Sequence, residues 1–279
     1  MHTDTTIRQS VSSDQRQLID QLRKKICDTQ MNRRNDNGSL ISCGSPDIDQ
    51  CLPAGGISRG TLTEWLVDQC GNSGEFLSLL AASRALTDGG ALVIADPHRR
   101  FYPPAATLLG IDLTNLIILR PRSSNSSTTK VPSQFQNDDL FWAVDQALRS
   151  TAVAAVWGWF TEIGEHWFRR FQLSAESSGC LGLFVRPTWT LQRPSWTEIQ
   201  WQVRPKSCSG NQQLRRLSLQ LLRCRTGRAG KTILLDIDTV TGSVQYARNQ
   251  QADPKHPTRD LCLATQLAHP KVDRRAARA

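Results

Sequence analysis

Short, continuously apolar segments alternate with longer segments of helical periodicity through the middle of this chain. The apolar segments include ALVIAD (91–96), TAVAAVWGWF (151–160) and CLGLFVR (180–186). Helical periodicity falls between them, as in EFLSLLAASRAL (75–86) and LFWAVDQALRS (140–150). Strands of a parallel sheet are covered on both faces, so they are apolar throughout instead of alternating with polar residues. The sequence therefore predicts an α/β fold of three layers, with helices on both faces of a mainly parallel sheet.

The remaining elements follow from the same patterns and from turn residues. Further strands are expected at 40–43, 61–67 and 115–120, short helices at 45–52 and 102–110, and a longer helix at 162–179 that ends at Gly179. The segment 121–138 is rich in Ser, Thr, Asn and Gln and predicts a mobile loop. Past Arg186 the pattern changes, and antiparallel strands that extend the sheet are expected at 199–205, 214–225, 232–238 and 243–247.

The two ends of the chain differ from this core. A narrow apolar stripe of Leu18, Leu22 and Ile26 predicts a helix from about Ser13 to Met31. We therefore divide the chain into an N-terminal helical arm (1–36), a core (37–248) and a basic, flexible tail (249–279). The arm is expected to dock on a partner or on the core itself.

The charge balance is basic, with 34 Lys and Arg against 25 Asp and Glu, a formal net charge of +9. Residues 199–235 carry eight basic residues and no acidic one. Such a balance favours an anionic partner such as nucleic acid, and an effect of solubility or genome composition is the alternative.

Several classes of protein are excluded by composition. No apolar run is long enough to span a membrane, and MHTDTTIRQS at the start has no apolar segment typical of a secretory signal, so a cytoplasmic protein without membrane contact is expected. The eight cysteines form no C-x-x-C pair, and histidines do not occur at ligand spacing. No metal site and no role for the cysteines are therefore predicted.

A glycine-bearing loop between the strand at 61–67 and the following helix lies where a phosphate-binding loop would lie. Such a loop uses backbone N–H groups, a Lys that reaches the terminal phosphates and a Ser or Thr that holds magnesium. Here Gly71 and Gly74 are present, but Glu75 takes the place of the Lys and Phe76 that of the Ser or Thr. A carboxylate about 4 Å from a phosphate would repel it by roughly 4 kcal/mol at an effective dielectric constant near 20. The loop is therefore interpreted as a degenerate one, retained for its architecture.

Two further features support this interpretation. The sequence GRAGKT (227–232) contains Gly-Lys-Thr, but it has two residues between its glycines where four are needed, and a strand pattern follows, so it predicts a hairpin turn. The strand around Val153–Trp157 carries no acidic residue to hold magnesium, and Glu162 beyond it is interpreted as the start of a helix. We therefore predict no catalytic residues, no cofactor and no enzymatic activity.

Arginines provide the candidate contacts with DNA or a partner protein. The candidates are Arg99, Arg100, Arg169, Arg170, Arg215, Arg216, Arg223 and Arg225. A solvated surface is the alternative for each of them alone, and together they favour polyanion contact. Trp142, Trp157 and Trp167 lie at core-like positions and are interpreted as packing residues.

The order of several segments carries a resemblance to a known family. Ser45-Pro46-x-Ile48-Asp49 and Leu52-Pro53-x-Gly55-Gly56-x-x-x-Gly60-x-Leu62-Thr63-Glu64 resemble the start of a RecA-type core. Gly71-x-x-Gly74-Glu75-x-x-x-Leu79-Leu80 is similar to the ImuA family of RecA-like proteins. The segments ADPHRRFYPP (95–104), AVDQALRS (143–150), RRFQLSAES (169–177), FVRP (184–187) and LLRCR (221–225) agree in order, so the resemblance covers roughly residues 40–247.

This resemblance implies an adaptor in DNA-damage tolerance and the SOS response. The implied role is to assist error-prone translesion synthesis together with a catalytically inactive Y-family polymerase homologue, an error-prone replicative-type polymerase and RecA. Contact with DNA would be weak and non-specific. Two alternatives remain at this point: a division inhibitor of the SulA type, which shares a degenerate RecA-like core, and a DNA-dependent ATPase.

Overall fold

The computed structural model describes residues 40–68, 71, 73–121, 133–207 and 213–247. The predicted arm (1–36) and tail (249–279) lie outside the described residues, as does most of the segment 121–138. Where the structure does describe this last segment, the expected loop is wrong in part, because helix α5 (Ser133–Arg149) already begins at Ser133.

One mixed sheet organises the described part of the chain, with the strand order β3-β2-β4-β5-β1-β6-β7-β8-β9. Its parallel part consists of β1 (Leu62–Val67), β2 (Ala91–Ala95), β3 (Leu116–Leu119), β4 (Val153–Trp159), β5 (Leu181–Pro187) and β6 (Ile199–Lys206). Its antiparallel part adds β7 (Leu214–Cys224), β8 (Thr232–Asp238) and β9 (Val244–Tyr246) to β6. The predicted α/β fold with a parallel sheet extended by antiparallel strands is therefore confirmed.

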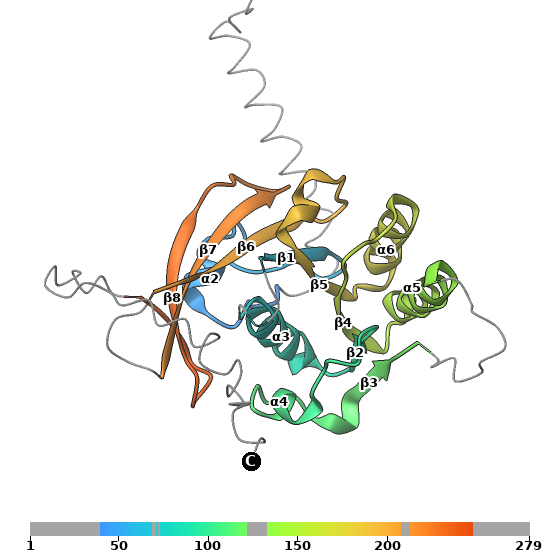
Figure 1. Cartoon of the computed structure of the whole chain (residues 1–279), viewed down its shortest axis with the longest axis horizontal. Helices are drawn as coiled ribbons and strands as arrows, with labels where there is room; N and C mark the ends of the chain where they lie inside the picture. Colours follow the sequence, from blue (N-terminus) through green and yellow to red (C-terminus); the bar gives the residue numbers. More distant parts are fainter. Residues whose placement is uncertain (1–39, 69–70, 72, 122–132, 208–212, 248–279) are drawn as a thin grey trace, which may run out of the picture. The chain divides into compact units, whose positions relative to one another are not determined.

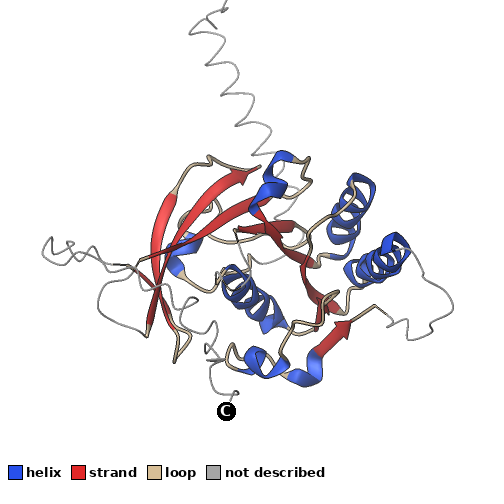
Figure 2. Cartoon of the chain, in the orientation of Figure 1, coloured by secondary structure: helices blue, strands red, loops and turns tan. Residues whose placement is uncertain are grey.

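Helices cover both faces of the parallel part and make the three layers (Figures 1 and 2). Helix α3 (Gly74–Ala85) packs on one face, and α5 and α6 (Glu165–Ser178) pack on the other. The strands of the parallel part that lie between these helices are buried along nearly their whole length, as their continuous apolar sequences predict. Each face has its own buried cluster, with Trp65 and Trp201 stacked at 6.0 Å on the α3 side.

Shorter helices complete the described residues. They are α2 (Pro46–Asp49), α4 (Pro103–Thr107) and three 3-10 helices, η1 (Leu86–Asp88), η2 (Leu113–Asn115) and η3 (Thr188–Gln192). The strand expected at 40–43 is reduced to a single bridge between Ile41 and Ile57. Within the described ranges, no helix is both long and apolar enough to cross a membrane.

One aromatic prediction is wrong. Trp142, expected in the core, is 57% exposed on α5, whereas Trp157 is buried as expected. The helical period places Phe141 and Val144 of α5 against the sheet, so the side chain of Trp142 turns away from it.

A buried carboxylate fastens α5 to α6. Asp145 of α5 is fully buried, and its oxygens accept hydrogen bonds from Ser174 Oγ at 2.6 Å, Arg170 Nε at 2.9 Å and Arg149 Nε at 3.0 Å. These donors satisfy the acid, so its burial does not leave an unpaired charge.

Replacing Asp145 by Ala should therefore loosen the packing of the two helices. We expect the free energy of unfolding to fall by about 1–3 kcal/mol, because a buried hydrogen-bond network loses its acceptor. Urea denaturation followed by circular dichroism measures this change. Asp139→Ala, at an exposed position of the same helix, is the matched control and should leave stability unchanged. Equal stability of the two variants would contradict this role of Asp145.

Candidate functional site

The loop between β1 and α3 is described by the structure at Asp68, Gly71 and Ser73. It runs from the buried end of β1 to Gly74, the first residue of α3, and Gly71 and Ser73 have positive φ angles of 85° and 64°. A Cβ atom at Gly74 would lie 2.3 Å from Cγ1 of Val67, so the close approach of helix and strand requires glycine there. The predicted strand, loop and helix unit is therefore present.

The charge of this loop is reversed. The backbone N–H of Gly71 donates a hydrogen bond of 2.9 Å to Oε1 of Glu75. Glu75 lies in the first turn of α3, where the helix dipole stabilises a negative charge. The Glu75 carboxylate thus accepts a hydrogen bond from a backbone N–H that could otherwise bind a phosphate. It would also repel any phosphate placed beside it.

The position of the magnesium-binding hydroxyl is apolar. Phe76 packs partly buried against the main cluster on the α3 side. Gly242, in the turn between β8 and β9, lies against its ring, since a Cβ there would be 3.6 Å from Cζ of Phe76. The aromatic ring therefore fills space with carbon atoms and offers no oxygen ligand.

Near the carboxyl ends of the neighbouring strands, the side chains of Trp157 and Asp96 make hydrogen bonds within the fold. On β4, Trp157 points toward α3, and its Nε1 donates to Ser78 Oγ at 2.8 Å. Asp96, after β2, is nearly buried and accepts from the N–H groups of Arg100 and Phe101 and from Arg120 Nε, at 2.7, 3.2 and 3.0 Å. These contacts hold its carboxylate in a turn. Among the residues that the structure describes, no three His, Cys, Asp or Glu side chains gather as metal ligands.

The described thiols are also poor candidates for chemistry. Cys43, Cys51, Cys180 and Cys224 are free and buried. Burial raises the pKa of the Cys180 thiol to about 12, and burial with Asp49 nearby raises the pKa of the Cys43 thiol well above its usual value. Both groups remain protonated at neutral pH, and the thiolate is the nucleophilic form.

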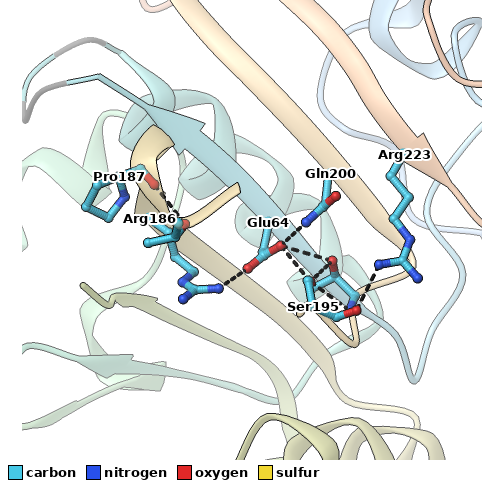
Figure 3. A network of polar contacts seen from close by, with 8 residues as sticks. Glu64, Arg186, Pro187, Ser195, Gln200 and Arg223 are labelled. Carbon is cyan, nitrogen blue, oxygen red and sulfur yellow. Dashed lines mark hydrogen bonds and ion pairs between the residues drawn. The ribbon is translucent and has the colours of Figure 1, made fainter. Parts of the chain in front are cut away.

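A second buried acid joins the centre of the sheet to the segment after β5 (Figure 3). Glu64 of β1 is 1% exposed, and its Oε1 is paired with Nη1 of Arg186 on β5. Its Oε2 accepts from Gln200 Nε2 at 2.6 Å, Ser195 Oγ at 2.7 Å and Thr197 Oγ1 at 3.2 Å. Four donors from three parts of the chain therefore meet at one carboxylate. Spacing in the sequence does not indicate this cluster, because its members lie 122 to 136 residues from Glu64 in the chain.

The arginine of this pair has few other partners. Its guanidinium lies over the ring of Phe168 at 5.3 Å, and its Nε has no hydrogen-bond partner although it is buried. Arg186 therefore depends on Glu64 for its charge neutralisation.

Replacing Glu64 by Gln keeps the shape of the side chain but leaves Arg186 as a buried, unneutralised charge. We expect the free energy of unfolding to fall by about 3–5 kcal/mol. The double variant Glu64→Gln with Arg186→Met should regain a large part of this loss, because it removes the charge as well. Glu176→Gln on the exposed side of α6 is the control. Urea denaturation measures these changes. A Glu64→Gln variant as stable as the wild type would contradict the role of Glu64 in neutralising Arg186.

The structure distributes the eight predicted arginines over separate elements. Arg99 and Arg100 lie in the turn after β2, and Arg169 and Arg170 lie on α6. Arg215 and Arg216 lie near the start of β7, and Arg223 and Arg225 lie at its far end. The last two pairs are therefore separated by most of a strand of 11 residues.

Three of these arginines make strong contacts within the fold. Arg216 forms two hydrogen bonds of 2.7 Å with Asp236 on β8, and Arg170 binds Asp145. Arg223 donates to the carbonyl oxygen of Ser195 at 2.8 Å. Arg169 and Arg215 are exposed, and of the two Arg169 stacks on Trp196. Trp196 belongs to the segment after β5, which also carries Trp189 and Arg193, stacked on each other. These residues were not among the predicted contacts.

Comparison with known proteins gives partial similarities to RecA. No family model matches the chain. It is 30% identical over 119 residues to RecA of Chlorobaculum parvum, which covers 40% of this chain and 34% of that protein. It is 29% identical over 144 residues to RecA of Chlorobium limicola, covering 50% and 39%. With RecA of Streptomyces coelicolor, 34% identity extends over 90 residues, or 32% and 24%.

The chain thus spans less than two fifths of the length of these relatives. Its parallel sheet with an antiparallel extension is consistent with a RecA-like core. Fold and sequence together show a distant and partial similarity to RecA, at the level of the RecA-like superfamily.

Proposed function

We propose that this protein is a non-catalytic RecA-like adaptor in DNA-damage tolerance, which assists error-prone translesion synthesis by binding polymerase-related partners. The distant similarity to RecA supports a role connected with DNA damage. The resemblance of the loop Gly71-x-x-Gly74-Glu75 to the ImuA family supports the adaptor role and its partners: an inactive Y-family polymerase homologue, an error-prone replicative-type polymerase and RecA itself.

The contact between Glu75 and Gly71 is the observation that carries this proposal. The carboxylate takes a loop N–H at 2.9 Å and gives the loop a negative charge where a nucleotide would bring its phosphates. Phe76 and Trp157 stand where a magnesium site would need oxygen ligands. A strand, loop and helix unit is thus present, with an acidic and an aromatic side chain where a nucleotide site would need a lysine and a hydroxyl.

A binding measurement with ATP tests directly whether the loop after β1 holds a nucleotide. We expect isothermal titration of the full chain with ATP and magnesium at millimolar concentration to give no saturable heat, and the melting temperature to stay unchanged, because a ligand without affinity for the folded state cannot stabilise it. The double variant Glu75→Lys with Phe76→Thr restores the charge and hydroxyl of a phosphate loop and should gain weak binding. Glu176→Lys makes the same change of charge on α6 and should not. Saturable binding by the wild-type chain would contradict the proposal and favour the ATPase alternative.

Binding of DNA should be weak, non-specific and steeply dependent on salt, because exposed arginines would contact phosphates and not bases. We expect fluorescence anisotropy with a labelled oligonucleotide to show a loss of affinity of at least about tenfold between roughly 50 and 200 mM salt. Affinity that is unchanged over this range would argue against phosphate contact by these arginines.

A further inference from the structure

The segment that follows β5 carries two arginine–tryptophan stacks on one stretch of chain. The guanidinium carbon of Arg193 lies 5.2 Å from the centre of the Trp189 ring. Arg169, from α6, lies at the same distance from the ring of Trp196. Between the stacks, Leu191 is 46% exposed, and Trp189 itself is 52% exposed. We call these five residues the stacked surface. It combines exposed apolar groups with two oriented cations.

The backbone under the stacked surface is fixed at several points. Glu64 holds the hydroxyls of Ser195 and Thr197, and Arg223 holds the carbonyl of Ser195 (Figure 3). At the other end of the segment, Thr188 Oγ1 donates to Asp68 at 2.7 Å. A surface that is already ordered loses little conformational entropy on binding, which favours its use as a docking site.

The stacked arginines are suited to carboxylates. A guanidinium that lies over an indole ring keeps its N–H edges free, and these edges match the two oxygens of a carboxylate or phosphate. Arg193 already binds Glu162 at 3.0 Å, with 50% and 62% of the two side chains exposed. An ion pair this exposed contributes little stability, so a carboxylate from another protein can replace Glu162.

Two observations favour a protein partner over a nucleic acid at this surface. One face of each tryptophan ring is already covered by an arginine, which reduces the area on which bases could stack. Tryptophan and arginine are also the residue types that contribute most to the affinity of protein interfaces.

We propose that the stacked surface, formed by Trp189, Leu191, Arg193, Trp196 and Arg169, docks a segment of a partner protein in which Asp or Glu side chains flank an apolar side chain. The apolar side chain would pack on Trp189 and Leu191, and the carboxylates would bind the edges of the two guanidinium groups. This proposal rests on the proposed adaptor function, for which it supplies a partner-binding site.

Site-specific photo-crosslinking in cells tests the proposal. A benzophenone amino acid replaces Leu191 in the full chain, and in a control it replaces Trp142, an exposed apolar position on α5. Cells are treated with a DNA-damaging agent and irradiated, and the cross-linked peptides are sequenced by mass spectrometry. We expect position 191 to yield a protein peptide with Asp or Glu beside the cross-linked residue, and position 142 not to yield it.

The synthetic form of that peptide then serves as the probe for the purified chain. Its affinity, measured by fluorescence anisotropy, should fall about tenfold or more in Arg169→Ala and in Trp189→Ala. It should be unchanged in Arg215→Ala, which removes an exposed arginine on β7, and in Trp142→Ala. Unchanged melting temperatures would show that the variants are folded.

Three results would overturn the proposal: cross-links from position 191 to nucleic acid, cross-links to peptides without carboxylates, or yields no higher than from position 142. Each of them leaves the adaptor function standing if a polymerase-related protein still purifies with the chain. Loss of that co-purification would refute the function itself, whatever position 191 contacts.

Discussion

The pairing of Glu64 with Arg186 holds together several separate parts of this fold. It joins β1 to β5 at the centre of the parallel sheet, and through Gln200 it reaches β6, where the antiparallel extension begins. Through Ser195 and Thr197 it also fixes the segment after β5. A buried ion pair is stable only if its remaining hydrogen-bonding groups are largely satisfied, and here the acid has four donors. The packing of the segment after β5 against the centre of the sheet therefore depends on one carboxylate.

At the carboxyl end of β1, the loop that leads to α3 combines backbone glycines with an acidic and an aromatic side chain. Gly74 is required by its contact with Val67, and the positive φ angle of Gly71 is required by the turn. Both residues serve the backbone and would be needed whether or not a nucleotide binds. Glu75 and Phe76 project side chains from this backbone, and there the electrostatics and the hydrogen-bonding capacity are changed. A glycine pattern alone is thus a poor guide to nucleotide binding, because it indicates the conformation of the turn and does not show whether a nucleotide binds there.

Apolar runs and helical periodicity in the sequence predict most of the helices and strands of this fold, but few of its polar contacts. Continuous apolar runs placed the strands of the parallel sheet correctly, while the strand expected at 40–43 is reduced to one bridge. The start of α5 was missed because its first turn is polar, and Trp142 was misplaced because a residue next to a buried one in a helix points elsewhere. The partners of Glu64, Arg170 and Arg216 lie 20 to 136 residues away in the chain. Neither spacing nor periodicity reveals such pairs, since they arise only when the sheet assembles.

Co-purification from damaged cells tests the adaptor role most directly. The tagged full chain is recovered after ultraviolet irradiation, at moderate salt and with nuclease present so that DNA cannot bridge proteins, and its partners are identified by mass spectrometry. We expect recovery of a Y-family polymerase homologue, a replicative-type polymerase or a recombinase. Recovery of the tubulin-like division protein alone would contradict it and favour a division inhibitor, and recovery of no specific protein would contradict it as well.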